Sequence, residues 1–488
     1  MKTLGFLTID KLLDAKAALL WCLVGTASFQ LAWSVSFCRC FILLYLWSVF
    51  QMTRCATTRQ AFYFSLLLGM LASAPQLEFF WRIFGGAAIV LWVIWSFWIQ
   101  IFVLLARFCR VHCRPLPAAI LIPFLWMGFE YFRSELYYLR FSWLSAGLVF
   151  SGQQGALPLG LIGVYGVGFL MIGVVSGISL MARERRLPAL IGAMVLLAGF
   201  TGIPLGGRQQ SVRENAGSLN VAGIQMEFPS ELEILAGLNE LVKAHPEAQL
   251  LVLSEYSIDG PVSPRIKTWC RSHSRYLVVG GKDPVTNTGF YNTAFVVGPT
   301  GEVVFRQAKS VPIQFFKDGL PAASQAIWDS PWGKLGFCIC YDLSYSRVTD
   351  RLVRLGAQAL IVPTMDVETW GAHEHQLHSL IAPARAAEYA LPIFRLASSG
   401  ISQCVDANGR VQAAAPMTGG SEIISGTLVL PKAGRLPLDR YLAPLAVLAT
   451  TGWIVCLPFI MRKERTTKSS LANQASKPES HPPAQVEA

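Results

Sequence analysis

Long runs of apolar residues occupy the first part of the chain and return close to its end. Because a helix needs about 20 apolar residues to cross the hydrocarbon core of a bilayer, we expect about eight membrane-spanning segments. These segments cover residues 17–34, 37–52, 61–74, 84–106, 117–133, 156–181, 188–206 and 440–461. Residues 37–52 and 61–74 are short for a span, and 61–74 could instead enter the bilayer and return on the same side.

Residues 215–435 have a different pattern, in which short β-like runs alternate with helical ones. The predicted strands are 219–226, 249–255, 276–281, 292–298, 334–340, 358–364 and 392–399. The predicted helices are 229–245, 261–273, 344–355 and 373–390. Strands that alternate with helices predict an α/β domain, with its functional residues at the ends of strands.

Together the two patterns divide the chain into four parts. We expect an N-terminal transmembrane bundle at 1–206, an extramembrane α/β domain at 215–435 and a last transmembrane helix at 440–461. Residues 466–488 are rich in Ser, Lys, Pro and Gln, which predicts a disordered cytoplasmic tail.

Composition and charge support this membrane topology. The chain is 53% hydrophobic and only 15% charged, whereas a soluble domain has about 25% charged residues. Lys and Arg gather in every second loop between the predicted spans, at 2–16, 54–59, 107–114, 183–186 and 462–468. Short cytoplasmic loops carry such residues, so we expect both termini in the cytoplasm and residues 215–435 on the opposite side, which in a bacterium is the periplasm.

The net charge of +11 is largely explained by these basic loops. The basic residues therefore flank membrane spans and do not form the continuous basic surface that a nucleic-acid-binding protein needs. We expect no nucleic-acid partner.

A cysteine stands where an apolar run ends and the chain turns. The run from Leu335 to Cys340 stops abruptly at Tyr341 and Asp342, which predicts a thiol at the mouth of a buried strand. A free thiol is mostly protonated at neutral pH, so it needs a base or a nearby cation to attack a carbonyl. Glu255, at the end of a predicted strand, is the candidate base, and Lys309 is the candidate cation. Lys309 and the backbone N–H of Tyr341 could stabilise an oxyanion.

The order Glu255, Lys309, Cys340 occurs together with several local motifs. These are SEY at 254–256, ICYD at 339–342, VPTMDVETWG at 362–371 and RAAEYALPIFR at 385–395. On these residues the 215–430 region resembles the nitrilase, or carbon–nitrogen hydrolase, superfamily. The membrane half narrows the resemblance, because residues 123–147 and 158–170 are similar to the apolipoprotein N-acyltransferase family.

The resemblance implies a four-layer αββα sandwich and an acyl transfer in two steps. Cys340 would take an acyl chain from a phospholipid as a thioester, and the α-amine of a diacylglyceryl-cysteine apolipoprotein would then accept it. The membrane-integral protein would lie in the bacterial inner membrane with its catalytic domain in the periplasm. Tyr341, Asp342, Trp370 and His378 are the candidate substrate-binding residues. We expect no cofactor and no metal ion.

The chain departs from the family pattern around the lysine. Alignment on Val311 and Pro312 puts Gln307 at the lysine position, so Lys309 is our candidate and Lys317 the alternative. The acidic residue of that stretch has no clear match, and Asp342 stands where the family usually has Glu. A membrane-anchored amidase, or an inactive relative that only binds lipoproteins, remains an alternative function.

Other polar clusters favour structural roles. His373, His375 and His378 lack the H-E-x-x-H spacing of zinc sites. Arg385 and Glu388 lie three residues apart on a predicted helix, which predicts an ion pair. Glu130 and Arg133 lie near the outer end of a predicted span, where they could form a structural pair or contact a lipid headgroup.

Overall fold

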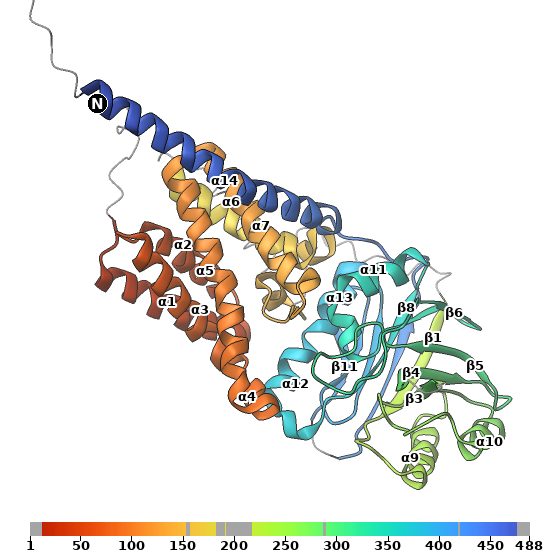
Figure 1. Ribbon diagram of the computed structural model, residues 1–488. Helices are drawn as coiled ribbons and strands as arrows, with labels where there is room; N and C mark the ends of the chain where they lie inside the picture. Colours follow the sequence, from red (N-terminus) through yellow and green to blue (C-terminus); the bar gives the residue numbers. More distant parts are fainter. Residues whose placement is uncertain are drawn as a thin grey trace, which may run out of the picture.

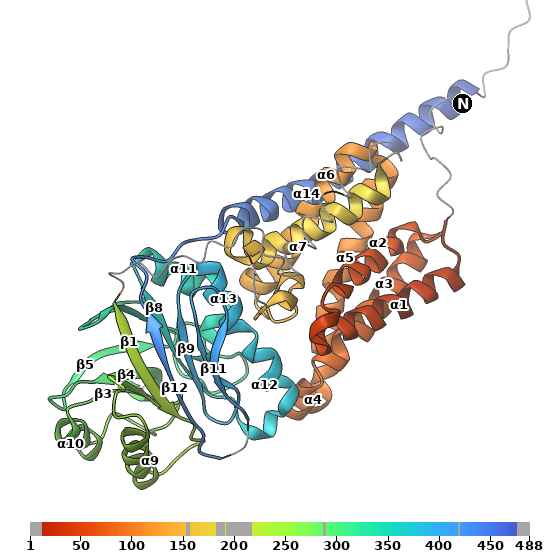
Figure 2. The same cartoon turned by 180° about the vertical axis from the view of Figure 1, so that it is seen from behind.

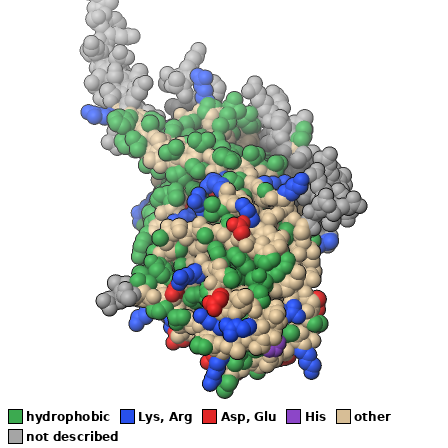
Figure 3. Space-filling view, turned by 90° about the vertical axis from the view of Figure 1, so that its right-hand side faces the viewer, with side chains coloured by type: hydrophobic (Ala, Val, Ile, Leu, Met, Phe, Trp, Pro, Cys, Tyr) green, Lys and Arg blue, Asp and Glu red, His purple; other side chains and the backbone are tan. Residues whose placement is uncertain are grey.

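The computed structural model describes residues 12–152, 157–181, 191, 217–285, 289–417 and 420–475. It consists of a helical bundle and an α/β domain that contains two β-sheets (Figure 1). In the face shown in Figure 3, hydrophobic side chains gather on the visible upper part of the molecule, whereas charged side chains are spread over the α/β domain below it.

The bundle helices are α1 (Ala15–Ser34), α2 (Phe41–Gln51), α3 (Thr58–Gln76), α4 (Phe79–Phe84), α5 (Ala88–His112), α6 (Pro115–Tyr131), α7 (Leu157–Leu180) and α14 (Asp439–Ala475). Local sequence sets their starts, since Asp14 caps α1, and Thr57 with Gln60 forms a capping box at α3.

Small residues let the bundle helices pack closely against one another. A Cβ at Gly69 would lie 2.8 Å from Ser96 of α5, and one at Gly128 would lie 2.8 Å from the carbonyl oxygen of Ala446 in α14.

Five helical segments of the described residues are long and apolar enough to cross a membrane. They are Ala15–Ser34, Phe79–His112, Pro115–Leu136, Leu159–Leu180 and Asp439–Arg462. The predicted span at 37–52 corresponds to the 11-residue α2, which is too short to cross, and 61–74 lies within α3. The predicted span at 188–206 lies outside the described residues, except for residue 191. The expected count of eight spans is therefore not confirmed.

The α/β domain contains two six-stranded sheets. One has the order β12-β1-β2-β3-β4-β5, with β1 (Ser218–Ile224), β2 (Leu250–Val252), β3 (Tyr276–Val285), β4 (Gly289–Val297), β5 (Val303–Ala308) and β12 (Ile423–Val429). The other has the order β11-β10-β9-β8-β7-β6, with β6 (Ile327–Ser330), β7 (Gly333–Phe337), β8 (Ala359–Thr364), β9 (Ile393–Ala397), β10 (Ser402–Val405) and β11 (Val411–Ala415). All seven predicted strands are present, and β5, β6, β10, β11 and β12 are additional.

Helices cover both outer faces of the paired sheets. These are α9 (Glu231–Ala244) and α10 (Pro264–His273) on one side, and α11 (Ser346–Arg354), α12 (Ala372–Ser379) and α13 (Ile381–Tyr389) on the side toward the bundle (Figure 2). Side-chain alternation along β2 explains the layering, because Leu251 packs in the core under α9 and α10 whereas Leu250 and Val252 pack in the other core. The layers therefore run helix, sheet, sheet, helix.

A cluster of buried charges joins the bundle to the α/β domain. We call Asp350, Arg385, Glu388, Asp439 and Arg440 the charged seam. The predicted Arg385–Glu388 ion pair is confirmed at 2.6 Å. Arg440 lies 3.0 Å from Glu388, 2.7 Å from Asp439 and 2.9 Å from Asp350. The seam therefore connects α11 and α13 of the α/β domain to the first turn of α14.

The seam also holds α7 at a break in its backbone. Gly163 has φ 75° and ψ 173°, which interrupts the helix and leaves the following N–H groups without intrahelical acceptors. The N–H of Val164 donates to Glu388 (2.7 Å) and that of Tyr165 donates to Asp439 (3.0 Å). The two carboxylates therefore satisfy the new helix end, where negative charge is favourable.

Two further expectations differ from the structure. The backbone of α14 continues to Ala475, so the predicted disordered tail at 466–488 begins within a helix, and residues 476–488 lie outside the described part. Glu130 and Arg133 are both buried. Glu130 accepts from the N–H of Ala146 (2.7 Å), and Arg133 donates to the carbonyl of Phe141 (2.9 Å). Each bonds to the segment after α6, and neither lies at the bundle surface.

Replacing Arg440 tests the seam. Arg440→Met removes a cation and leaves Asp350 and Asp439 short of a buried partner, so we expect a loss of about 3–5 kcal/mol of stability. Thermal unfolding of the full chain in detergent measures this loss. The matched control is Arg435→Met, since Arg435 is exposed at the same junction. Equal melting temperatures for both variants and the wild type would contradict a stabilising role.

Candidate active site

Cys340 lies just beyond a strand, in a tight turn. β7 ends at Phe337, and Cys340 is the first residue of the 3₁₀ helix η7 (Cys340–Ser344). Its φ of 49° is unusual for a residue other than glycine, and such strain is typical of functional sites. The cysteine is therefore held after the strand, with its side chain 1% exposed, whereas the sequence predicted it at the strand's last position.

The carboxylate of Asp342 holds this turn in place. It accepts hydrogen bonds from the backbone N–H groups of Ile339 (3.2 Å), Ser310 (3.0 Å) and Val311 (2.7 Å). Asp342 is 1% exposed, and burial raises its pKa to about 6. The carboxylate thus joins the nucleophile's turn to the segment after Lys309, so its geometry favours a structural role over the predicted contact with substrate.

Lys309 lies between two carboxylates in the interior. Its Nζ is 2.8 Å from Oε1 of Glu255 and 2.7 Å from Oδ2 of Asp318, and the exposed fractions of these three side chains are 0%, 0% and 4%. Asn292 donates to both acids, at 2.5 Å and 2.9 Å. Lys317 is exposed, so the geometry favours Lys309 as the candidate cation.

The sequence analysis missed Asp318. Its carboxylate also accepts hydrogen bonds from the hydroxyl of Tyr256 (2.8 Å) and from the N–H of Ile313 (2.8 Å). The only signal in the sequence was an acid shortly after the lysine, in a loop without periodicity. Asp318 is thus a second acidic partner of Lys309.

Met365 connects Glu255 to the thiol. The N–H of Met365 donates to Oε2 of Glu255 (2.8 Å), and the Cys340 thiol donates to the Met365 carbonyl with a separation of 3.7 Å. Glu255, Lys309 and Cys340 are close enough for their charges to shift one another's pKa. The three candidate catalytic residues therefore converge, although they follow three different strands, β2, β5 and β7.

Burial and charge set the protonation states at this site. Burial raises the pKa of Cys340 well above its usual value, and Glu255 raises it further against the opposing effect of Lys309. Burial also raises the pKa of Glu255, although Lys309 opposes the shift. Burial would lower the pKa of Lys309, but Asp318 and Glu255 outweigh it and keep the ammonium charged. The resting thiol is thus protonated, and its proton must move as the sulfur attacks.

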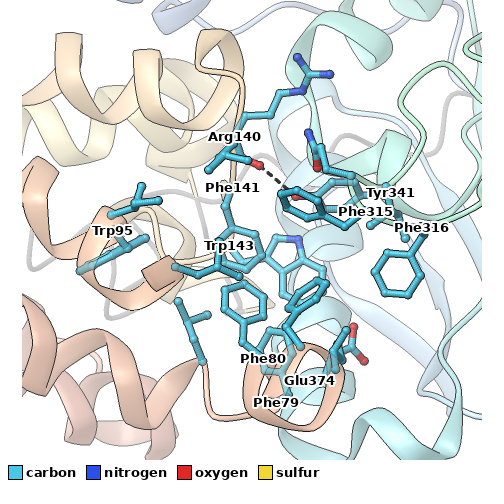
Figure 4. Close-up of a pocket in the computed structure, with 18 of the residues that line it drawn as sticks. Phe79, Phe80, Trp95, Arg140, Phe141, Trp143, Phe315, Phe316, Tyr341 and Glu374 are labelled. Carbon is cyan, nitrogen blue, oxygen red and sulfur yellow. Dashed lines mark hydrogen bonds between the residues drawn. The ribbon is translucent and has the colours of Figure 1, made fainter. Parts of the chain in front are cut away.

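An apolar cavity connects the thiol to the bundle. It encloses about 960 Å³ of empty space, part of which is open to the outside. Figure 4 shows Phe79, Phe80 and Trp95 from the α4–α5 region facing Phe315, Phe316 and Tyr341 across it. Of the predicted substrate residues, Tyr341, Trp370 and His378 line this cavity.

The segment after α6 is hydrogen-bonded to the nucleophile's turn. The indole N–H of Trp143 donates to Oγ of Ser344 (3.0 Å), and the hydroxyl of Ser142 donates to the Ser344 carbonyl (3.1 Å). The hydroxyl of Tyr341 donates to the carbonyl of Arg140 (3.2 Å). One wall of the cavity is therefore attached directly to the residues around Cys340.

His378 faces the same cavity beside Cys340. One potential metal-ligand atom from each of Cys340, Asp366 and His378 lies within 4.8 Å of the other two. However, Oδ1 of Asp366 is 2.7 Å from Nδ1 of His378, and Oδ2 is 2.5 Å from the guanidinium of Arg395. The ligand atoms of Asp366 are thus occupied by these partners, so the cluster is a hydrogen-bonded chain rather than a set of open metal ligands.

The other two histidines point to separate partners. His373 contacts Oε1 of Gln76 in the bundle (3.0 Å), and His375 contacts the carbonyl of Val367 (3.0 Å). The three histidines of α12 therefore do not converge on one point.

Replacing Lys309 tests its effect on the thiol. Lys309→Met leaves the carboxylates of Glu255 and Asp318 without their shared cation, so we expect the pKa of Cys340 to rise further and its alkylation by iodoacetamide to slow by about tenfold or more. Mass spectrometry of the Cys340 peptide gives the rate. Lys317→Met is the matched control and should alkylate at the wild-type rate. Slower alkylation in Lys317→Met alone would instead identify Lys317 as the cation.

Two family models match the chain. The carbon–nitrogen hydrolase model matches residues 222–438, and the apolipoprotein N-acyltransferase N-terminal domain model matches residues 17–177. Among solved structures, the match to Nit3 of Saccharomyces cerevisiae covers 44% of this chain and 92% of that chain, at 22% identity and a TM-score of 0.38.

Named relatives extend the match. The apolipoprotein N-acyltransferase of Geobacter metallireducens is 26% identical over 356 residues, which are 62% of this chain and 67% of that protein. That of Shewanella oneidensis is 24% identical over 417 residues, which are 74% of this chain and 77% of that protein. An omega-amidase of Mus musculus is 28% identical over 128 residues, which are 24% of this chain and 46% of that protein. Both halves of the chain are thus matched, and over most of its length it is similar to apolipoprotein N-acyltransferases, which points to an acyltransferase with a carbon–nitrogen hydrolase fold.

Proposed function

We propose that the protein transfers an acyl chain from a phospholipid, through a thioester on Cys340, to the N-terminal amine of a diacylglyceryl-cysteine apolipoprotein. The cavity carries this proposal, because Cys340 and residues of the bundle helices line the same cavity. An acyl chain that leaves the bilayer between these helices could reach the thiol without crossing water.

In the first step, Glu255 takes the thiol proton as the sulfur attacks the ester carbonyl carbon. The ammonium of Lys309 and the backbone N–H of Tyr341 stabilise the oxyanion. The C–O bond then breaks, and the lysophospholipid oxygen takes the proton from Glu255. In the second step, the amine of the acceptor attacks the thioester, and the sulfur leaves as a thiol.

The location follows from the membrane organisation. We place the protein in the bacterial inner membrane, with 1–206 and 440–461 forming its membrane part and 215–435 in the periplasm. The five apolar helices support the membrane part, and the basic loops support the orientation. Both proposed substrates would then meet the cavity at the outer leaflet.

Removing the nucleophile tests the chemistry. After exposure to phospholipid vesicles, mass spectrometry should find an acyl adduct on Cys340 in the wild type and none in Cys340→Ala, and lipoproteins from cells with the variant alone should retain a free α-amine. Cys338→Ala is the matched control, since Cys338 lies two residues earlier and is fully buried. Turnover of water-soluble amides without a lipid adduct would instead make the protein an amidase.

Filling the cavity tests where the acyl chain lies. Ile94 of α5 lines the cavity, whereas the neighbouring Val93 is 40% exposed on the outer surface. Ile94→Trp should reduce transfer from long-chain donors by about tenfold or more relative to short-chain donors, because the ring occupies space that only a long chain needs. Val93→Trp should leave the chain-length preference unchanged. Equal preferences in all three proteins would place the acyl chain elsewhere.

A further inference from the structure

The acceptor amine brings more protons to the site than Glu255 can accept at one time. An α-amine has a pKa of about 7.7–8.0, so at neutral pH it arrives mainly as an ammonium ion, which is not a nucleophile. Forming the amide removes two of its protons. One returns to the sulfur of Cys340, and the other must go to a second acceptor.

Hydrogen bonds already occupy most of the acceptor positions of the Glu255 carboxylate. Its Oε1 accepts from both Lys309 (2.8 Å) and Asn292 (2.5 Å), and its Oε2 accepts from the N–H of Met365 (2.8 Å). A carboxylate oxygen has two lone pairs, so one position on Oε2 remains for a proton. Glu255 is fully buried and is not among the cavity-lining residues.

His378, in contrast, lies on the cavity wall. Its Nδ1 bonds to Oδ1 of Asp366 (2.7 Å), and Arg395 holds the other oxygen of Asp366 (2.5 Å). Asp366 is charged, because the charge of Arg395 and the hydrogen bond from His378 outweigh burial and lower its pKa. Nδ1 therefore carries the hydrogen, which leaves the lone pair on Nε2 as the acceptor. The ring stacks on Trp143 at 4.7 Å, which fixes its plane.

We propose that His378, oriented by Asp366 and Arg395, takes the first proton of the acceptor's ammonium at Nε2, so that the free amine can attack the thioester on Cys340. This inference rests on the proposed function. The ammonium N–H bond breaks, and the proton moves to Nε2. The amine nitrogen then bonds to the thioester carbon, the C–S bond breaks, and the remaining excess proton reaches the sulfur through Glu255. The imidazolium of His378 releases its proton to water.

The groups that face His378 are compatible with a neutral imidazole. They are Asp366 after β8, Arg395 on β9, Cys340 in η7, and Glu374 and His375 on α12. Burial lowers the pKa of His378 although Asp366 opposes the shift, so the ring is neutral at physiological pH. Burial, reinforced by Asp366, raises the pKa of Glu374 well above its usual value, which disfavours the charged carboxylate that would compete for the ammonium.

The test separates the two steps in the full chain in detergent. Phospholipid vesicles supply the acyl group, adduct formation on Cys340 reports the first step, and a synthetic S-diacylglyceryl-cysteinyl peptide discharges it in the second. In His378→Gln we expect the first step at the wild-type rate and a second step about 10²-fold slower at pH 7. The deficit should shrink to below about tenfold at pH 9, because the peptide amine is then already deprotonated. His373→Gln, on the same helix, is the matched control.

Imidazole rescue provides a second measurement. Imidazole added to acylated His378→Ala should accelerate the discharge, since it replaces the missing proton acceptor. A wild-type discharge rate in His378→Gln, or equal losses in both steps at every pH without rescue in His378→Ala, would overturn the assignment. Absence of any acyl adduct in the wild type would instead overturn the proposed function, so the two failures can be distinguished.

Discussion

The charged seam fixes the bundle against the α/β domain, and the geometry of the site depends on it. The cavity has walls from both parts, so a shift of either part would separate the thiol from the helices that face it. Ion pairs removed from water are stable only when every charge has its partners. Here each seam carboxylate bonds to a guanidinium, and two of them also accept backbone N–H groups from the break in α7. One relative position satisfies all of these bonds.

The charges around Cys340 are arranged so that the thiol stays protonated until the substrate arrives. An ammonium close to a cysteine commonly produces a thiolate, but Lys309 is shared between two carboxylates that offset its charge. Burial and Glu255 then keep the thiol protonated. In the proposed reaction the sulfur becomes anionic only as the ester carbonyl arrives, when Glu255 takes the proton and Lys309 becomes available to the oxyanion.

The sequence allowed prediction of the residues that end apolar strands, because the pattern marks both the strand and its end. Cys340 and Glu255 are of this kind. Asp366 and Arg395 could not be paired from sequence, since their contact depends on the parallel register of β8 and β9, in which Val362 lies opposite Arg395. Asp342 is polar and follows the nucleophile, yet its carboxylate is occupied by backbone N–H groups, which only the fold of the neighbouring loop shows.

The number of spans could not be predicted for a related reason. An apolar run can be buried in lipid or in protein, and the composition of the two cases is the same. Ile42, Leu46 and Val49 of α2 are fully buried against other helices, so their hydrophobicity reflects packing within the bundle. Length then separates the cases, because 11 residues do not cross a bilayer.

The apolar cavity explains why a second proton acceptor would belong on its wall. Aromatic side chains that hold an acyl chain also exclude water from a thioester, which protects it from hydrolysis. The same walls disfavour a charged ammonium, so the acceptor must lose its charge as it enters. His378 stacks on Trp143 of the segment after α6 while its Nδ1 bonds to Asp366 of the α/β domain. Its ring is thus positioned by both parts of the protein, at the junction where an amine anchored by its own lipid chains would meet the thioester.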